Sequence, residues 1–261
     1  MIGRRAVVGL TLLCALLFSA FAASSAQASN GTTAFTCEKV TKGAQFSDAH
    51  CTKEGTGEGF IHKEIKQDET TTIHGTNEKT SADTKTATSA ILTSSIGGEP
   101  AEITCEKVFA HGGLVNRLDP ITKEHYIEGE AGITILYTGC KFLKPSTCKL
   151  KEEKIEVTGA RATTKGQGDS IRFEPPEGSK VFVTLLAEKC FGIAKLPIEG
   201  TVNGKVNGAT LEFTAAETTA EKTLTFNKQP AGLEGKITLS QAEKTEESAK
   251  TGNPISATTV T

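Results

Sequence analysis

The sequence predicts an all-β protein, an antiparallel β-sandwich or open barrel that is stabilised by three disulfides. Short stretches of alternating apolar and polar residues recur along the chain, as expected of half-buried strands. Pairs rich in Gly, Asn and Pro separate them and favour tight turns, because Gly and Asn tolerate a positive φ and Pro presets its own. Of the seven cysteines, six follow an apolar N-terminal segment. Such an even set is typical of the disulfide framework of an exported protein.

Residues 1–28 are predicted to be a signal peptide. Arg4 and Arg5 give it a basic start, and Ala26-Gln27-Ala28 supplies the small-x-small pattern that precedes a cleavage site, here before Ser29. The apolar run between them is shorter than the roughly 20 residues of a membrane span, and no comparable run follows it. We therefore expect a secreted, extracellular protein whose mature chain has no membrane span.

Residues 29–98 are predicted to form an N-terminal β unit that ends near Gly97-Gly98. Within it, the segment from 66 to 90 is rich in threonine, and Ile73 is its one large apolar residue. Such a composition supports either a pair of exposed edge strands or a poorly ordered connection.

Residues 99–240 are predicted to form the main β domain. Alternation predicts strands at 132–137, 154–158, 170–173, 180–185, 223–226 and 235–239, and a hairpin within 200–213. Turns are expected at Gly97-Gly98, Gly112-Gly113, Pro175-Pro176-Glu177-Gly178, Asn203-Gly204 and Asn207-Gly208. Short strands at this spacing suggest a sandwich or an open barrel. Residues 241–261 lack a helical apolar face and are expected to be a polar C-terminal tail.

The disulfides are expected to use Cys37, Cys51, Cys105, Cys140, Cys148 and Cys190, for which 15 pairings exist. Cys37 with Cys51 and Cys140 with Cys148 can each close locally across a turn-rich loop. That choice leaves a long bridge from Cys105 to Cys190, and the alternative pairs Cys105 with Cys140. No Cys-x-x-Cys occurs and exported thiols oxidise, so a zinc site is disfavoured.

One string has the composition of a catalytic motif. Gly168-Asp169-Ser170-Ile171 resembles the nucleophile block of the GDSL esterases, which lies near the start of the mature enzyme and is completed by Asp and His close to the C-terminus. Here the block lies mid-chain and no histidine follows Ser170. A turn that enters a strand is therefore the favoured interpretation. A small secreted hydrolase based on Ser170 is kept as the alternative, and no catalytic residue is predicted.

The best candidate for a metal site is the pair His62 and His74. The two would face each other if 60–65 paired with 70–75 as a hairpin, with Glu64 nearby as a third ligand. Short ligand spacings such as His-x-His are absent, and solvated histidines are common on strands. We therefore predict no metal and no other cofactor, and a metal-dependent hydrolase belongs to the alternative.

The composition also disfavours several classes of partner. The net charge is −2 and no polybasic block occurs, so a nucleic acid or an anionic membrane has no electrostatic footprint here. The chain has no Trp and two Tyr, so the aromatic platform of a typical sugar-binding module is missing. Thr-rich edge strands can add to a partner's sheet, although their hydroxyls and charges also simply solvate an edge.

One resemblance covers most of the mature chain. The chain resembles a group of secreted, cysteine-containing, β-rich bacterial proteins through Phe35-Thr36-Cys37, Asp48-Ala49-His50-Cys51, Glu102-Ile103-Thr104-Cys105, Tyr137-Thr138-Gly139-Cys140 with Pro145 and Cys148, Gly166-Gln167-Gly168-Asp169, and Ala231-Gly232-Leu233-Glu234-Gly235. The resemblance implies export and paired cysteines. It brings no catalytic residue, cofactor or substrate.

Taken together, these observations predict a secreted extracellular or cell-envelope protein with a non-catalytic binding or structural role. Its partner is expected outside the cell or at the envelope, and the protein itself is expected to be a monomer.

Overall fold

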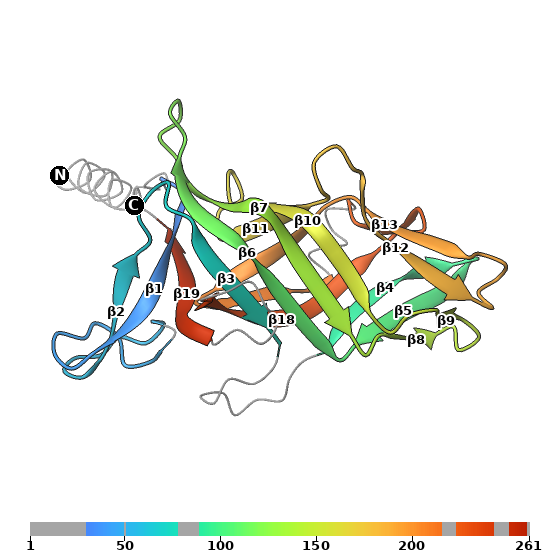
Figure 1. Ribbon diagram of the computed structural model, residues 1–261, viewed down its shortest axis with the longest axis horizontal. Helices are drawn as coiled ribbons and strands as arrows, with labels where there is room; N and C mark the ends of the chain where they lie inside the picture. The colour runs from blue at the N-terminus through green and yellow to red at the C-terminus, as the bar shows by residue number, and fades with distance from the viewer. Residues whose placement is uncertain (1–29, 50, 78–88, 216–222, 243–250, 260–261) are drawn as a thin grey trace, which may run out of the picture. The chain divides into compact units, whose positions relative to one another are not determined.

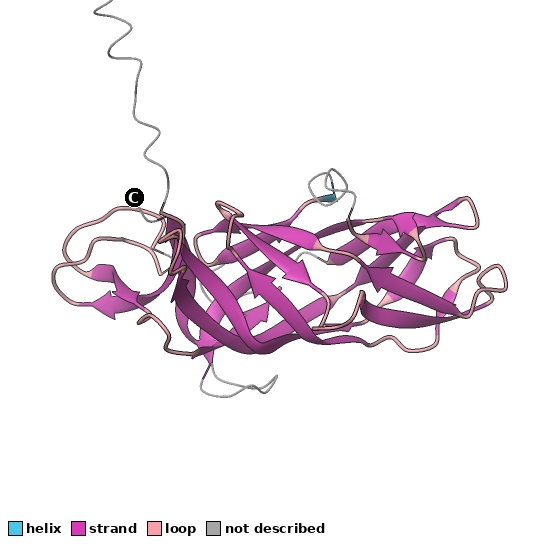
Figure 2. Cartoon of the chain, turned by 90° about the horizontal axis from the view of Figure 1, so that it is seen from above, coloured by secondary structure: helices cyan, strands magenta, loops and turns pink. Residues whose placement is uncertain are grey.

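The computed structural model describes residues 30–49, 51–77, 89–215, 223–242 and 251–259. The predicted signal peptide, 1–28, lies outside them. The named elements of the described residues are all strands, numbered β1 to β19 (Figure 2). Three disulfides join the six cysteines of this part of the chain. The prediction of an antiparallel all-β fold with three disulfides is confirmed, and of the two expected architectures the structure has a barrel.

Eight antiparallel strands form a closed ring, which we call the ring (Figure 1). In ring order they are β3 (Thr71–Thr76), β6 (Lys107–Leu118), β7 (His125–Thr138), β10 (Ile155–Thr163), β11 (Ser170–Glu174), β14 (Val202–Asn207), β15 (Thr210–Phe213) and β18 (Gly232–Ala242). Pairing of β15 with β18 closes the ring, with Leu211 opposite Ile237. Each of these strands therefore has a partner on both sides, which removes exposed sheet edges.

The alternation predicted for the ring strands arises because successive side chains point to opposite faces of a strand. In β7, for example, Ile133, Ile135 and Tyr137 line the interior of the ring. Tyr126 of the same strand is not among these lining residues, and its aromatic side chain lies beneath the ammonium group of Lys165. The strands predicted at 132–137, 154–158 and 170–173 are confirmed as parts of β7, β10 and β11.

Eight further strands make up what we call the open region. β4 (Ala90–Ile96), β5 (Glu99–Cys105) and β8 (Lys141–Lys144) extend from β18, and a separate five-stranded sheet contains β9 (Lys149–Leu150), β12 (Val181–Glu188), β13 (Lys195–Glu199), β16 (Thr225–Phe226) and β17 (Gln229–Pro230). Ile96, Leu196 and Phe226 are buried here, in the same apolar cluster as the ring core. Of the described strands, β8, β9 and β17 each pair with one neighbour only, so this region keeps sheet edges.

Three strands lie beside the ring: β1 (Thr32–Val40), β2 (Gly59–Glu64) and β19 (Thr251–Thr259) (Figure 1). Asn116 of β6 joins β1 to the ring. Its side-chain oxygen accepts a hydrogen bond from the Ala34 amide at 2.8 Å, and its amide group donates to the carbonyls of Ala34 and Ile65 at 2.8 and 2.7 Å. Ala34, Ile65 and Ile255 belong to the apolar cluster of the ring, so β1 and β19 extend its core.

Two predictions about the organisation of the chain are wrong. The boundary expected at Gly97-Gly98 is the two-residue turn of the β4–β5 hairpin, and the φ angles of 62° and 87° explain why glycine stands at both positions. The described residues from Asn30 onward belong to one compact unit. The expected polar tail contains β19, because Ile255, at 2% exposure, is buried against the core; residues 243–250 lie outside the described part.

The Thr-rich segment also differs from the prediction of edge strands or a loose connection. β3 is an inner strand between β6 and β18, and residues 78–88 lie outside the described part. A single large apolar residue suffices, because the inward positions of β3 are Ile73 and Gly75. A Cβ at Gly75 would lie 3.0 Å from the side chain of Leu239, so β18 packs closely here.

Two expected turns are strand segments. Gly112-Gly113 lies inside β6, at an irregularity in its pairing with β7, and Asn203-Gly204 lies inside β14. A Cβ at Gly204 would approach the side chain of Leu211 to 2.6 Å, so this glycine is required by close packing. Glycine at a close approach and glycine in a turn give the same signal in sequence.

The disulfide pairing is partly as predicted. Cys37 pairs with Cys51, which confirms the first local bridge. The expected Cys140–Cys148 and Cys105–Cys190 bridges are wrong, and the alternative pairing of Cys105 with Cys140 is confirmed, with Cys148 bonded to Cys190. The reason is strand pairing: β8 follows Cys140 and pairs with β5, which ends at Cys105, so the two Cα atoms lie 4.0 Å apart.

Candidate functional site: an apolar cavity in the barrel

The structure does not bring the predicted metal-binding histidines together. The hairpin of 60–65 with 70–75 is not formed, because β2 pairs with β1 and β3 pairs with β6 and β18. Glu64, the expected third ligand, lies opposite Phe35 in the pairing of β2 with β1. Within the described residues, no three His, Cys, Asp or Glu side chains are grouped so that they could hold a metal ion.

Each of the two histidines instead packs on aromatic rings. The ring of His62 lies 3.5 Å from that of Phe35 and 4.3 Å from that of Phe46, measured between centroids. Burial lowers the pKa of His62, and a hydrogen bond with the Cys51 backbone acts in the opposite direction. His74 lies opposite His111 in the pairing of β3 with β6, and its imidazole centroid lies 4.6 Å from the centroid of the Phe109 side chain.

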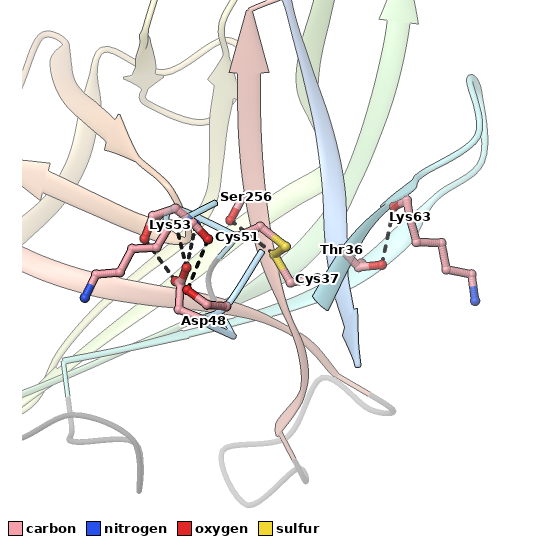
Figure 3. Close-up of a disulfide and its surroundings, with 9 residues drawn as sticks. Thr36, Cys37, Asp48, Cys51, Lys53, Lys63 and Ser256 are labelled. Carbon is pink, nitrogen blue, oxygen red and sulfur yellow. Dashed lines mark hydrogen bonds between the residues drawn. A yellow bond between two sulfur atoms is a disulfide. The ribbon is translucent and has the colours of Figure 1, made fainter. Parts of the chain in front are cut away.

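The N-terminal disulfide is part of this small aromatic cluster. Cys37 and Cys51 pack with Phe35, and the loop that carries Cys51 is fixed by Asp48. The carboxylate of Asp48 accepts hydrogen bonds from the backbone amides of Thr52 and Lys53 at 3.0 and 2.6 Å (Figure 3). These contacts account for the folded loop around Cys51.

Ser170 is placed at the start of β11, as the turn-to-strand interpretation predicts. Its hydroxyl donates to Asp169 at 3.4 Å, and its amide donates to the Gln167 carbonyl at 3.2 Å. The hydrogen bonds of Ser170 within the described chain include no histidine. These contacts give no support to a Ser–His pair at this position.

Two adjoining cavities lie inside the barrel and were not predicted. The first lies within the ring and has a volume of about 60 Å³. The second lies at the junction with the open region and has a volume of about 90 Å³. Both are bordered by Ala90, Ile135, Tyr137, Phe173, Phe213 and Leu233. Because they share these walls, we treat them as one candidate site, which we call the barrel cavity.

Small residues at inward positions explain why the ring is not filled. Ala110, Ala162 and Gly235 all border the first cavity, and a Cβ at Gly235 would meet no atom nearer than 3.5 Å. An eight-stranded barrel is just wide enough either to be filled by side chains or to hold one small ligand. Alanine and glycine at inward positions leave room for a small ligand.

The division between the two cavities is aromatic. Phe173 of β11 and Phe213 of β15 lie 5.8 Å apart between ring centroids, at an interplanar angle of 52°. This is a favourable tilted geometry. Both rings border both cavities, so they stand at the boundary between the two.

Few polar side chains border the barrel cavity. Tyr137 contacts both parts of it, and Glu234 and Lys236 border the first part only. Lys236 forms an ion pair with Glu212 at 2.8 Å, and Glu234 and Lys236 are exposed. Burial raises the pKa of Tyr137 to about 12. The site can therefore surround an apolar molecule and offer it one phenol.

The barrel cavity could not be recognised from the sequence alone. Strand alternation identified Ile133, Ile135 and Tyr137 as one face, but it did not show what lies opposite that face. The signal that could have found the cavity is the number of Ala and Gly residues at inward positions, which is readable only once the register is known.

Comparison with known proteins adds no relative. No protein-family model, no curated protein and no solved structure matches this chain. The resemblance to secreted bacterial proteins therefore stays a prediction. Separately, the described residues contain no helix with the length and apolar character that a membrane crossing requires.

Proposed function

We propose that this protein is an exported, non-catalytic binding protein that holds one small apolar molecule in the barrel cavity. The observation that carries the proposal is the pair of adjoining cavities, whose common wall is formed by carbon-rich side chains and a single hydroxyl. Pockets for small molecules are typically concave and largely apolar, with few polar groups that fix orientation.

The energetics favour an apolar occupant. Atoms that line an empty space lack partners on one side and lose dispersion contacts. Water gains little there, because a buried water needs two to four polar partners, and engineered apolar cavities of roughly 150 Å³ stay dry yet bind benzene or xenon. A bound hydrocarbon surface restores those contacts and is removed from water, at about 25 cal/mol per Å².

A catalytic role has less support. Catalysis needs titratable groups that converge on a reacting atom. The described polar residues of the cavity wall are Tyr137, Glu234 and Lys236, and Lys236 is paired with Glu212. Neither Ser170 nor the two candidate histidines His62 and His74 border the barrel cavity.

Export is supported by the three disulfides, because such bonds persist in oxidising compartments. Mass spectrometry of native material tests this part of the proposal. We expect a mature N-terminus at Ser29 and no free thiol in the mature chain. Reduced cysteines, or a retained leader in the cytosol, would contradict it.

Calorimetric titration with isopropylbenzene tests the binding function. We expect saturable binding of one molecule per chain. Ala162→Leu adds carbon atoms at a residue that borders the cavity and is expected to weaken binding roughly tenfold or more, since extra methylenes have no room. Thr158→Leu is the matched control, because Thr158 lies exposed on the same strand.

The two variants separate filling of the cavity from a general effect of leucine on β10. Circular dichroism must show that both variants are folded. Absence of binding to the unaltered protein would overturn the proposal. So would equal affinities for Ala162→Leu and Thr158→Leu.

A further inference from the structure

We propose that Tyr137 is the polar anchor of the barrel cavity: its hydroxyl donates a hydrogen bond to a neutral oxygen acceptor on the bound molecule. The protein would then select apolar molecules that carry a carbonyl or ether oxygen over pure hydrocarbons. This inference rests on the proposed function and names the class of ligand.

The position of Tyr137 places it at the centre of the site. It lies near the end of β7, paired with Val108 of β6 on one side and Ile155 of β10 on the other. It follows Ile133 and Ile135 in the inward-facing row. It borders both parts of the barrel cavity, so a molecule in either part can reach it.

The side chain of Tyr137 is half-buried among apolar residues. Its side chain keeps partial exposure, yet desolvation raises its pKa to about 12. The two observations agree if the exposed part faces the cavity, where neighbouring carbon atoms replace solvent. At neutral pH the phenol is protonated and is available as a donor.

The Tyr137 hydroxyl has no hydrogen-bond partner among the described residues, and desolvation is the one cause of its pKa shift. Buried hydroxyls in folded proteins are nearly always hydrogen-bonded, and a buried Tyr O–H usually finds an acceptor. An unpartnered phenol beside an empty apolar space is therefore a place where a ligand can supply the missing acceptor.

The charge of the site indicates a neutral acceptor. An ionised carboxylate in an apolar cavity is costly unless it is paired. Lys236, the one cation on the described cavity wall, is paired with Glu212. A ketone, an ester or an ether meets the phenol without that cost.

A matched pair of probes tests the inference. Acetophenone and isopropylbenzene have nearly the same shape, but only acetophenone carries a carbonyl oxygen. Calorimetry measures both affinities for the unaltered protein, Tyr137→Phe and Tyr126→Phe. Tyr126→Phe is the control, because Tyr126 is the other tyrosine of the chain and its ring lies under Lys165 at 5.3 Å.

Tyr137→Phe keeps the ring and removes one oxygen. We expect it to weaken acetophenone binding roughly threefold to tenfold, the value of one hydrogen bond, and to leave isopropylbenzene within about twofold. Tyr126→Phe should change neither affinity. Equal effects of Tyr137→Phe on both probes would overturn the anchor while the binding function stands. If neither probe binds the unaltered protein, the function itself is overturned.

A second measurement does not depend on the Tyr137→Phe variant folding. The chain has two Tyr and no Trp, so its near-ultraviolet absorption is that of tyrosine. Hydrogen-bond donation by a phenol shifts this absorption to longer wavelength. Acetophenone absorbs in the same region, and so do aliphatic ketones, so dibutyl ether and nonane replace the aromatic probes here. A red shift with dibutyl ether alone, retained in Tyr126→Phe, supports the anchor, and identical spectra with both probes contradict it.

Discussion

The ring and the open region hold their strands in place by different means. No strand of the ring contains a cysteine, and β15–β18 pairing completes the circle through backbone hydrogen bonds. In the open region, β8 and β9 are edge strands, and Cys105–Cys140 and Cys148–Cys190 lie next to them. Two of the three disulfides therefore lie where the sheet is not closed by strand pairing, and the third, Cys37–Cys51, joins β1 to the loop before β2.

The physical reason is that an unclosed sheet region gains less from cooperative pairing. Its edge strands can fray, since they lack hydrogen bonds on one side. Bridges that span 35 and 42 residues restrict the unfolded chain and hold such strands in place. The ring has no such edge, and it surrounds the first part of the barrel cavity without a disulfide in its strands.

The largest expected effect comes from removing a bridge in the open region. Chain-entropy reasoning gives about 4 kcal/mol for the loop between Cys148 and Cys190, and about 3 kcal/mol for the shorter Cys37–Cys51 loop. Urea unfolding of the Cys148→Ala/Cys190→Ala double variant measures the loss. Hydrogen exchange should speed up in β12 and β9 and stay slow in the ring.

That comparison would fail if the double variant lost protection equally in all strands. Equal destabilisation by Cys37→Ala/Cys51→Ala would also weaken it. The first result would mean that the open region and the ring unfold as one unit regardless of their closure.

The next largest effect is expected in the ring core. Leu211 is 1% exposed and borders the barrel cavity. Leu211→Ala should cost about 3 kcal/mol and enlarge the cavity, because buried Leu→Ala changes lose both transfer energy and packing. Urea unfolding measures the cost, and exchange should accelerate in all ring strands together. Acceleration confined to β14 and β15 would contradict a cooperatively closed ring.

A smaller effect is expected where β1 joins the ring. Asn116→Ala removes three hydrogen bonds and leaves backbone groups of Ala34 and Ile65 unsatisfied. We expect a loss of about 2 kcal/mol, with faster amide exchange in β1. Unchanged exchange at the Ala34 amide would show that Asn116 does not hold this strand.

The smallest effect concerns the loop between β6 and β7. A hydrogen bond from Lys165 and the amides of Thr122 and Ile121 hold the pKa of Asp119 well below its ordinary value. A depressed carboxyl pKa stabilises the fold above the ordinary value near 4, and this contribution is lost as the pH falls through the folded-state pKa. The stability difference between the protein and Asp119→Asn should therefore shrink from pH 7 towards pH 2.

Asp169→Asn is the control for this titration. The Asp169 carboxylate is exposed and lies 3.7 Å from Lys205, a surface pair of little expected value. A stability difference for Asp119→Asn that stays constant with pH would contradict the role assigned to its ionised form.

The sequence predicted local features well, because local signals depend on neighbouring residues. Alternation located β7 and β10, Gly97-Gly98 formed a tight turn, and Cys37 found Cys51 across a nearby loop. Predictions failed where distant segments decide the outcome. β3 became an inner strand only because β18, far along the chain, pairs with it.

The candidate site was less predictable than the fold for the same reason. His62 and His74 were expected to meet as hairpin neighbours, but β2 and β3 pair with other strands. Ala110 and Ala162 are unremarkable in sequence, and they leave a space only when the closed ring turns them inward. A glycine that permits close packing, such as Gly204, looks the same as one in a turn.

The most direct test of the account is to locate xenon in a crystal under xenon pressure, because xenon enters dry apolar cavities and scatters strongly. We expect xenon inside the barrel cavity, in contact with Ile135 and Leu233 and close to Tyr137. An interior without xenon, or with ordered water filling it, would contradict the claim that the ring encloses an apolar binding site.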